Sequence, residues 1–86
     1  MHTADLLDQA LRAAEQLGYK VRQEWLGGGS SGDCEIKGQK WLFIDLSQGL
    51  PDQLHVVVEA LRREPQAAAL NLVPPLRKLL PLKKAA

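Results

Sequence analysis

Hydrophobic residues recur at three- and four-residue spacings in two stretches of the chain, 3–17 and 51–63. This spacing places them on one face of an α-helix. The first stretch opens with Thr3, a favoured N-cap residue, and is followed by Gly18, which suits the left-handed end of a helix. The second opens with Pro51, which is favoured at the first helical position. We therefore predict two amphipathic helices over these ranges.

Between the two helices, apolar and polar residues alternate with a period of two, which is the pattern of β-strands. Three strands are predicted, at 19–26, 34–37 and 40–46. A Gly/Ser-rich loop at 27–32 joins the first two strands, and the dipeptide at 38–39 fits a two-residue hairpin of type II′. Short connections favour an antiparallel meander.

The third strand is unusual because both of its faces are apolar. Leu42 and Ile44 lie on one face, and Trp41 and Phe43 lie on the other. In a simple meander this strand would lie at an edge, where an apolar strand invites association with other chains. Either the strand is central, or the C-terminal segment or a partner subunit covers it.

The C-terminal third predicts a short final helix. Pro65 ends the second long helix, and the prolines at 74 and 75 can start a helix over 76–80. We therefore predict one α+β domain at 1–82, of order α-β-β-β-α, with a three-stranded antiparallel sheet, helices on one face and a short C-terminal helix. A frayed basic tail is predicted at 83–86.

Composition places the chain among ordinary globular proteins. It has 86 residues, 45% of them hydrophobic and 24% charged, and a formal net charge of +1. Such a charge is too small to steer the whole molecule toward nucleic acid or a membrane. Residues 51–86 nevertheless carry six bases and three acids. A small nucleic-acid-binding protein is therefore an alternative, with a basic patch formed by Arg62, Arg63, Arg77, Lys78, Lys83 and Lys84.

Location follows from what the sequence lacks. No apolar run approaches the roughly 20 residues that cross a bilayer, and the N-terminus has no basic and apolar secretory pattern. A single cysteine excludes an internal disulfide framework. We therefore expect a cytoplasmic protein without a membrane partner.

Candidate chemistry is sparse. Catalysis by Cys34 would need a nearby base, and no spacing brings His2 or His55 to it. Alternation places Cys34 on the same face of its strand as the apolar Ile36, so we expect Cys34 to be buried. His55 and Glu59 are neighbours on a helix, but a metal site needs three or more ligands. We therefore predict no catalytic residue, cofactor or metal, and keep a thiol-dependent enzyme as an alternative.

The aromatic residues suggest a surface. Trp25, Trp41 and Phe43 make up most of the aromatic side chains. They could stack nucleic-acid bases, although three nearby carboxylates would oppose binding; these are Asp33, Glu35 and Asp45. The preferred hypothesis is a non-enzymatic interaction module that forms a homodimer, or binds another protein, through Trp41, Phe43 and Trp25.

Part of the sequence resembles a group of small uncharacterised bacterial proteins. The resemblance covers roughly residues 17–63 and rests on a Gly-Gly loop, the hairpin at 34–38, the strand at 42–45 and the Leu-Pro opening of the following helix. It implies a layout and no functional residue. The layout is also remotely similar to the front half of repressor-cleaving zinc peptidases. Those enzymes need His-Glu-x-x-His, and the helix here has only His55 of that motif, so at most a non-catalytic relative is implied.

Overall fold

The computed structural model of the chain describes residues 2–25, 27 and 31–80. It contains helices and strands in the predicted order, so the α+β class is confirmed. The elements are α1 (Thr3–Gln16), β1 (Lys20–Glu24), β2 (Gly32–Ile36), β3 (Gln39–Asp45), α2 (Leu50–Arg62), the 3₁₀ helix η1 (Pro65–Ala69) and α3 (Pro74–Arg77). The tail predicted at 83–86 lies outside the described residues.

The sheet is mixed, so the prediction of an antiparallel sheet holds for β2 and β3 but not for β1. The strand order is β1-β3-β2, with β1 parallel to β3 and β2 antiparallel to it. The connection after β1 spans two strand spacings, about 10 Å, which leaves room for β3 between the other two strands. The most apolar strand thereby takes the central position, one of the two outcomes that its sequence allowed.

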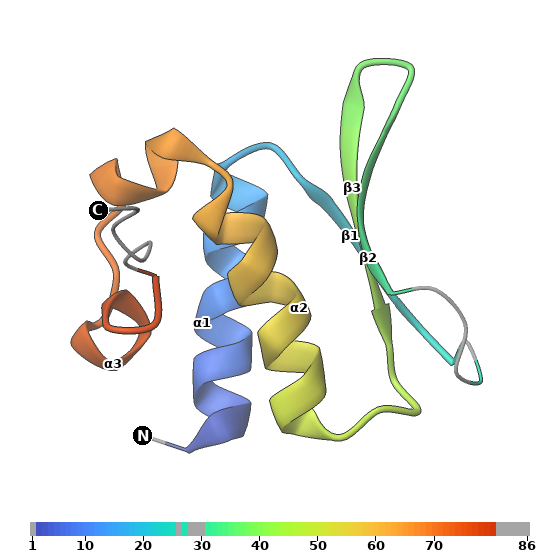
Figure 1. Cartoon of the computed structure of the whole chain (residues 1–86), viewed down its shortest axis with the longest axis horizontal. Helices are drawn as coiled ribbons and strands as arrows, with labels where there is room; N and C mark the ends of the chain where they lie inside the picture. The colour runs from blue at the N-terminus through green and yellow to red at the C-terminus, as the bar shows by residue number, and fades with distance from the viewer. Residues whose placement is uncertain (1, 26, 28–30, 81–86) are drawn as a thin grey trace, which may run out of the picture.

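The two long helices lie side by side on one face of the sheet, while η1 and α3 lie on the side of this helix pair away from the sheet (Figure 1). The prediction of helices on one face therefore holds for α1 and α2 but not for α3. Alanines at the buried faces of α1 and α2 let the helices approach closely. The buried core comprises Leu7, Ala10, Ala13, Ala14, Tyr19, Leu42, Ile44, Val57, Val58, Ala60, Leu61 and Leu76.

Two local predictions need correction. His2, and not Thr3, is the N-cap of α1, and its backbone N–H donates to the Asp5 carboxylate at 3.3 Å. The β2–β3 turn is formed by Lys37 and Gly38, with φ of 52° and 80°. Positive φ at both central residues is the type I′ pattern, so the turn lies one residue earlier than predicted and is not type II′.

Candidate functional site

The candidate site is the face of the sheet that the helices leave uncovered. Along β3, Leu42 and Ile44 point to the helices and are 0% exposed, so alternation turns Trp41 and Phe43 to the other side. The ladder register extends this face across all three strands. We call it the open face; it comprises Lys20, Arg22, Glu24, Cys34, Ile36, Trp41 and Phe43.

Two aromatic rings form the middle of the open face. The Trp41 and Phe43 ring centroids are 5.9 Å apart, and the ring planes differ by 10°. Lys20 Nζ lies 5.6 Å from the centroid of the Trp41 ring, a distance at which a cation is attracted to an aromatic face. Both rings are half-buried, and Ile36 on the neighbouring strand is 47% exposed.

Trp25 is not part of this cluster. It follows the last residue of β1 and is 75% exposed. Glu24 lies beside Asp45 in the ladder, and the Leu46 N–H donates to the Glu24 carbonyl oxygen at 2.8 Å. Trp25 therefore belongs to the Asp45 end of the sheet, whereas Trp41 lies toward the β2–β3 turn.

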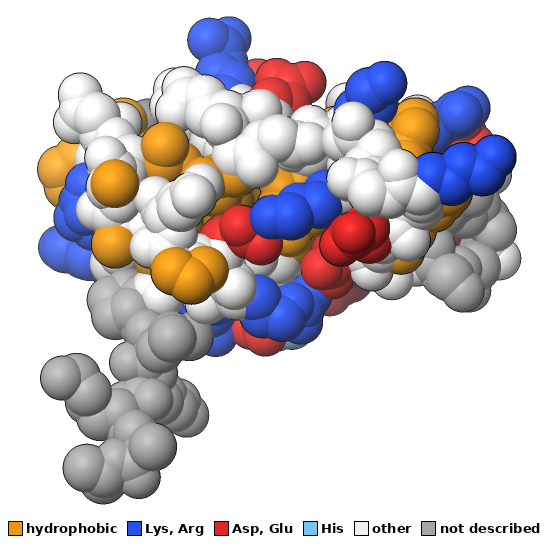
Figure 2. All heavy atoms as spheres, turned by 90° about the horizontal axis from the view of Figure 1, so that it is seen from above, with side chains coloured by type: hydrophobic (Ala, Val, Ile, Leu, Met, Phe, Trp, Pro, Cys, Tyr) orange, Lys and Arg blue, Asp and Glu red, His pale blue; other side chains and the backbone are white. Residues whose placement is uncertain are grey.

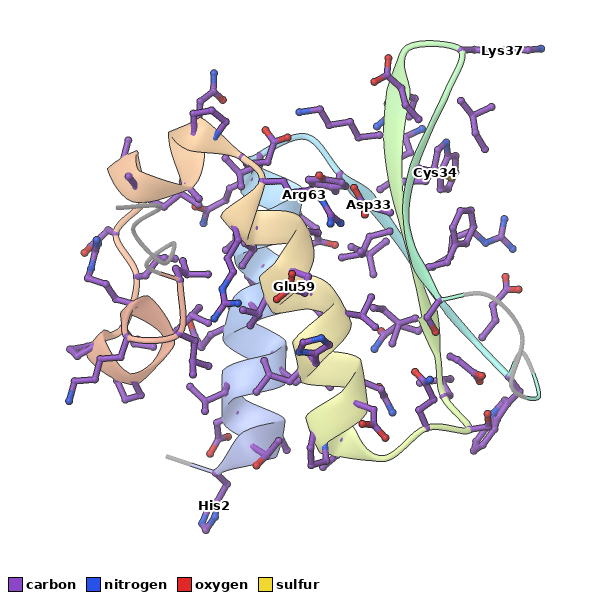
Figure 3. All side chains as sticks on the ribbon, in the orientation of Figure 1. His2, Asp33, Cys34, Lys37, Glu59 and Arg63 are labelled. Carbon is purple, nitrogen blue, oxygen red and sulfur yellow. The ribbon has the colours of Figure 1, made fainter. Side chains whose placement is uncertain are left out.

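Cys34 is exposed, so the expectation that it is buried is wrong. It lies opposite Trp41 in the β2–β3 ladder, on the side of the sheet away from the helices (Figure 3). Because both long helices lie on the other side, alternation along β2 turns Asp33 and not Cys34 toward the core. A sequence can show that Cys34 and Ile36 share a face, but not which face the helices will cover.

The thiol has no histidine beside it among the described residues. His2 lies at the start of α1, at the opposite side of the molecule from Cys34 (Figure 3). His55 lines a shallow pocket between α2 and the segment after α3, of about 210 Å³, together with Leu54, Val58 and Leu79. The general base that a cysteine nucleophile requires is therefore not supplied by either histidine.

An ion-paired cluster joins the sheet to the C-terminal end of α2. Asp33 binds Arg63, and Lys40 Nζ donates to Glu64 at 2.8 Å. Figure 3 shows Asp33 and Arg63 pointing toward each other from the two layers, and the view onto this end of the molecule shows basic and acidic side chains interleaved (Figure 2). The cluster neutralises its own charges, which indicates a structural role.

The cluster also shifts two pKa values. The hydrogen bond to Glu64 is the main cause that raises the pKa of Lys40 above its ordinary value of 10.5. Burial is the main cause that raises the pKa of Tyr19 above 10.0, with a further contribution from Glu64. Lys40 Nζ lies 5.6 Å from the Tyr19 ring centroid, so the two groups belong to one cluster.

The arginines of the predicted basic patch bind the protein's own acceptors. Arg62 donates to a Glu59 carboxylate oxygen at 2.8 Å and to the Leu79 carbonyl oxygen. Arg63 is paired with Asp33 across the layers. Glu59, which lies one helical turn after His55, thus forms an ion pair with Arg62.

The rest of the predicted basic patch is spread over the C-terminal segment. Arg77 donates to the Leu70 carbonyl oxygen at 2.7 Å, and Lys78 is exposed. Lys83 and Lys84 lie outside the described residues. Arg77, like Arg62 and Arg63, therefore binds an acceptor of the protein itself.

The three carboxylates expected to oppose nucleic acid do not lie exposed on the open face. Asp33 and Glu35 alternate with Cys34 and point toward the helix side. Asp45 is fully buried and accepts hydrogen bonds from the Ser47 N–H at 2.9 Å and the Ser47 hydroxyl at 2.7 Å. The exposed part of the open face on β3 therefore ends at Phe43.

Within the described residues, no group of three or more His, Cys, Asp or Glu side chains could hold a metal ion. None of the helices described is long and apolar enough to cross a membrane. Comparisons of the chain with protein-family models, with curated proteins and with solved structures found no match.

Proposed function

We propose that this chain is a non-enzymatic interaction module that self-associates through the open face. The observation that carries the proposal is the stacked Trp41–Phe43 pair on a sheet face that neither long helix covers. Cys34 and Ile36 extend this apolar surface onto β2. Exposed apolar patches rimmed by polar residues are typical of protein interaction surfaces.

The charges around the open face favour a second copy as the partner. The β1 row contains Lys20 and Arg22 but also Glu24, so one copy presents both signs of charge. Arg22 and Glu24 already form an ion pair within the strand. A rim with both signs can face an identical rim without net repulsion, whereas a strongly basic or acidic partner would find little complementary charge.

The size of the open face sets the expected affinity. Three strands of five to seven residues, about 4.8 Å apart, give a surface smaller than the roughly 800 Å² that each partner contributes to a standard interface. Aromatic residues in the middle of such a surface still supply most of its binding energy. We expect a dissociation constant in the micromolar range, which corresponds to a binding free energy on the order of −8 kcal/mol.

The test is the molar mass in solution. We expect multi-angle light scattering to give a mass that rises toward twice the monomer mass between about 1 µM and about 1 mM protein. The Trp41→Lys and Phe43→Lys variants should remain monomeric, because dimer formation would bury an unpaired charge at the centre of the interface. Leu50→Lys is the matched control, since Leu50 is exposed at the start of α2, and should dimerise like the wild type.

Two results would contradict the proposal. One is a wild-type chain that stays at the monomer mass over the whole range while circular dichroism shows it folded. The other is binding of a short single-stranded oligonucleotide at ~50 mM salt, with quenched tryptophan fluorescence, by a monomeric wild type. The second result would assign the open face to base stacking between Lys20, Trp41 and Phe43.

A further inference from the structure

We infer that the second copy lies over the hairpin half of the open face, where it contacts Cys34 and Ile36 of β2 together with Trp41 and Phe43 of β3. Trp25 and the two edges of the sheet stay outside this interface. The inference rests on the proposed self-association and adds to it the position of the partner on the sheet. Within the open face, the interface is thereby limited to side chains of β2 and β3, and the charged β1 row forms its rim.

Exposure changes along the length of the sheet. At one end of β3, Asp45 is fully buried, and at the other end Ile36, beside Gln39, is 47% exposed. Phe43 and Trp41 lie between these ends and are half-buried. The apolar surface that is still available to a partner therefore runs from Phe43 toward the β2–β3 turn.

The width of the apolar surface points to the same half. Cys34 lies directly beside Trp41 in the antiparallel ladder, so apolar side chains continue from β3 onto β2. On the other side of β3, the positions beside Trp41 and Phe43 are Lys20 and Arg22. The apolar centre therefore covers β3 and β2, and β1 supplies a charged rim on one side only.

The edges of the sheet are unsuited to a partner. Strand β1 carries exposed Lys20, Arg22 and Glu24, and β2 carries Asp33 and Glu35. Charged side chains on edge strands discourage pairing with another chain. Two copies of β2 paired antiparallel around Cys34 would also place the acidic residues of one copy opposite those of the other.

Cys34 provides a built-in probe, because it is the sole cysteine in the sequence and is exposed. In a face-to-face dimer the thiol is covered, so N-ethylmaleimide reacts mainly with the monomer. We expect the alkylation rate of the wild type to fall by about tenfold between concentrations well below and well above the dissociation constant. A dimer formed through the β1 edge would leave the rate unchanged, because Cys34 lies on β2 at the opposite edge of the sheet.

Two matched substitutions test the boundary of the interface. Ile36→Lys should raise the dissociation constant by tenfold or more, whereas Trp25→Lys should change it by less than twofold, although Trp25 is the more exposed side chain. Both positions are exposed, so circular dichroism should show both variants folded. In a Trp25→Cys, Cys34→Ser chain that still dimerises, the new thiol should react at a rate independent of protein concentration.

The possible outcomes separate the two proposals. A concentration-dependent dimer in which Cys34 reacts at the monomer rate, or in which Trp25→Lys weakens association as much as Ile36→Lys, overturns the inference and leaves self-association standing. A wild type that is monomeric at all concentrations overturns the proposed function and this inference together. Protection of Cys34 with selective loss of dimer in Ile36→Lys supports both.

Discussion

At the scale of single residues, the side of the sheet on which a side chain lies decides its role. Asp33 and Cys34 are adjacent in the chain, yet Asp33 binds Arg63 on the helix side and Cys34 is exposed on the open face. Lys40 and Trp41 divide in the same way, with Lys40 bound to Glu64 and Trp41 stacked on Phe43. One layer of helices on one face produces both outcomes.

The cluster of Lys40, Tyr19 and Glu64 predicts a loss of stability in alkali. Both Lys40 and Tyr19 have pKa values raised in the folded chain, so the fold holds their protons more tightly than the unfolded chain does. The stabilisation is complete below about pH 10 and is lost as the pH rises through the raised values. We expect the urea midpoint to fall steeply above this pH.

Two lysine variants test whether Lys40 contributes to this loss of stability at high pH. In Lys40→Met the fall of the urea midpoint above pH 10 should be shallower than in the wild type, because the hydrogen bond to Glu64 is gone. Lys37→Met, at the exposed tip of the hairpin, should follow the wild-type profile. Equal slopes for Lys40→Met and the wild type would show that this ion pair does not produce the pH dependence.

At the scale of elements, the hairpin of β2 and β3 depends on a turn with two left-handed residues. Lys37 has φ of 52° and Gly38 has φ of 80°. A Cβ atom at position 38 would meet nothing within 4 Å, so a side chain there strains only the backbone. The Gly38→Ala change should therefore cost about 1–2 kcal/mol in the free energy of unfolding.

A substitution at the neighbouring position 37 should have the opposite effect on the free energy of unfolding. A lysine is a poor residue for the left-handed region, whereas asparagine tolerates it and is favoured at this place in type I′ turns. Lys37→Asn should stabilise the fold by about 0.5 kcal/mol in urea denaturation, with no change in the open face. If Gly38→Ala were neutral and Lys37→Asn destabilising, the type I′ assignment would be wrong.

At the scale of the whole molecule, the fold has three layers: the sheet, the pair of long helices and the C-terminal segment (Figure 1). The third layer is held by Leu76, which is fully buried although α3 has only four residues. Arg62 adds hydrogen bonds to the Leu79 carbonyl oxygen. A helix this short has no stability of its own, so packing must hold it in place.

Leu76→Ala therefore tests whether the third layer belongs to the cooperative unit. We expect a loss of about 2–5 kcal/mol in the free energy of unfolding, the usual range for a buried leucine. Thermal unfolding followed by circular dichroism measures it, with exposed Lys78→Ala as the control that should stay within about 0.5 kcal/mol. An unchanged melting temperature would mean that the C-terminal segment unfolds independently.

Much of the local structure was predictable from the sequence. The apolar periodicity located α1 and α2 to within about a residue, and alternation located the three strands. The two apolar faces of β3 correctly limited its position to a central or a covered strand. The candidate site was predictable only in part, since Trp41 and Phe43 do lie together and Trp25 does not.

The sequence by itself determined which residues of each helix and strand share a face, because that depends only on the periods of 3.6 and 2. The tertiary structure alone decided the strand order, the parallel pairing of β1 with β3 and the face that α1 and α2 cover. These features depend on contacts between residues far apart in the chain. Strand β3 is the most apolar strand, so it buries the most apolar surface when it lies at the centre of the sheet. That choice buried one face of β3 and left Trp41, Phe43 and Cys34 on the open face.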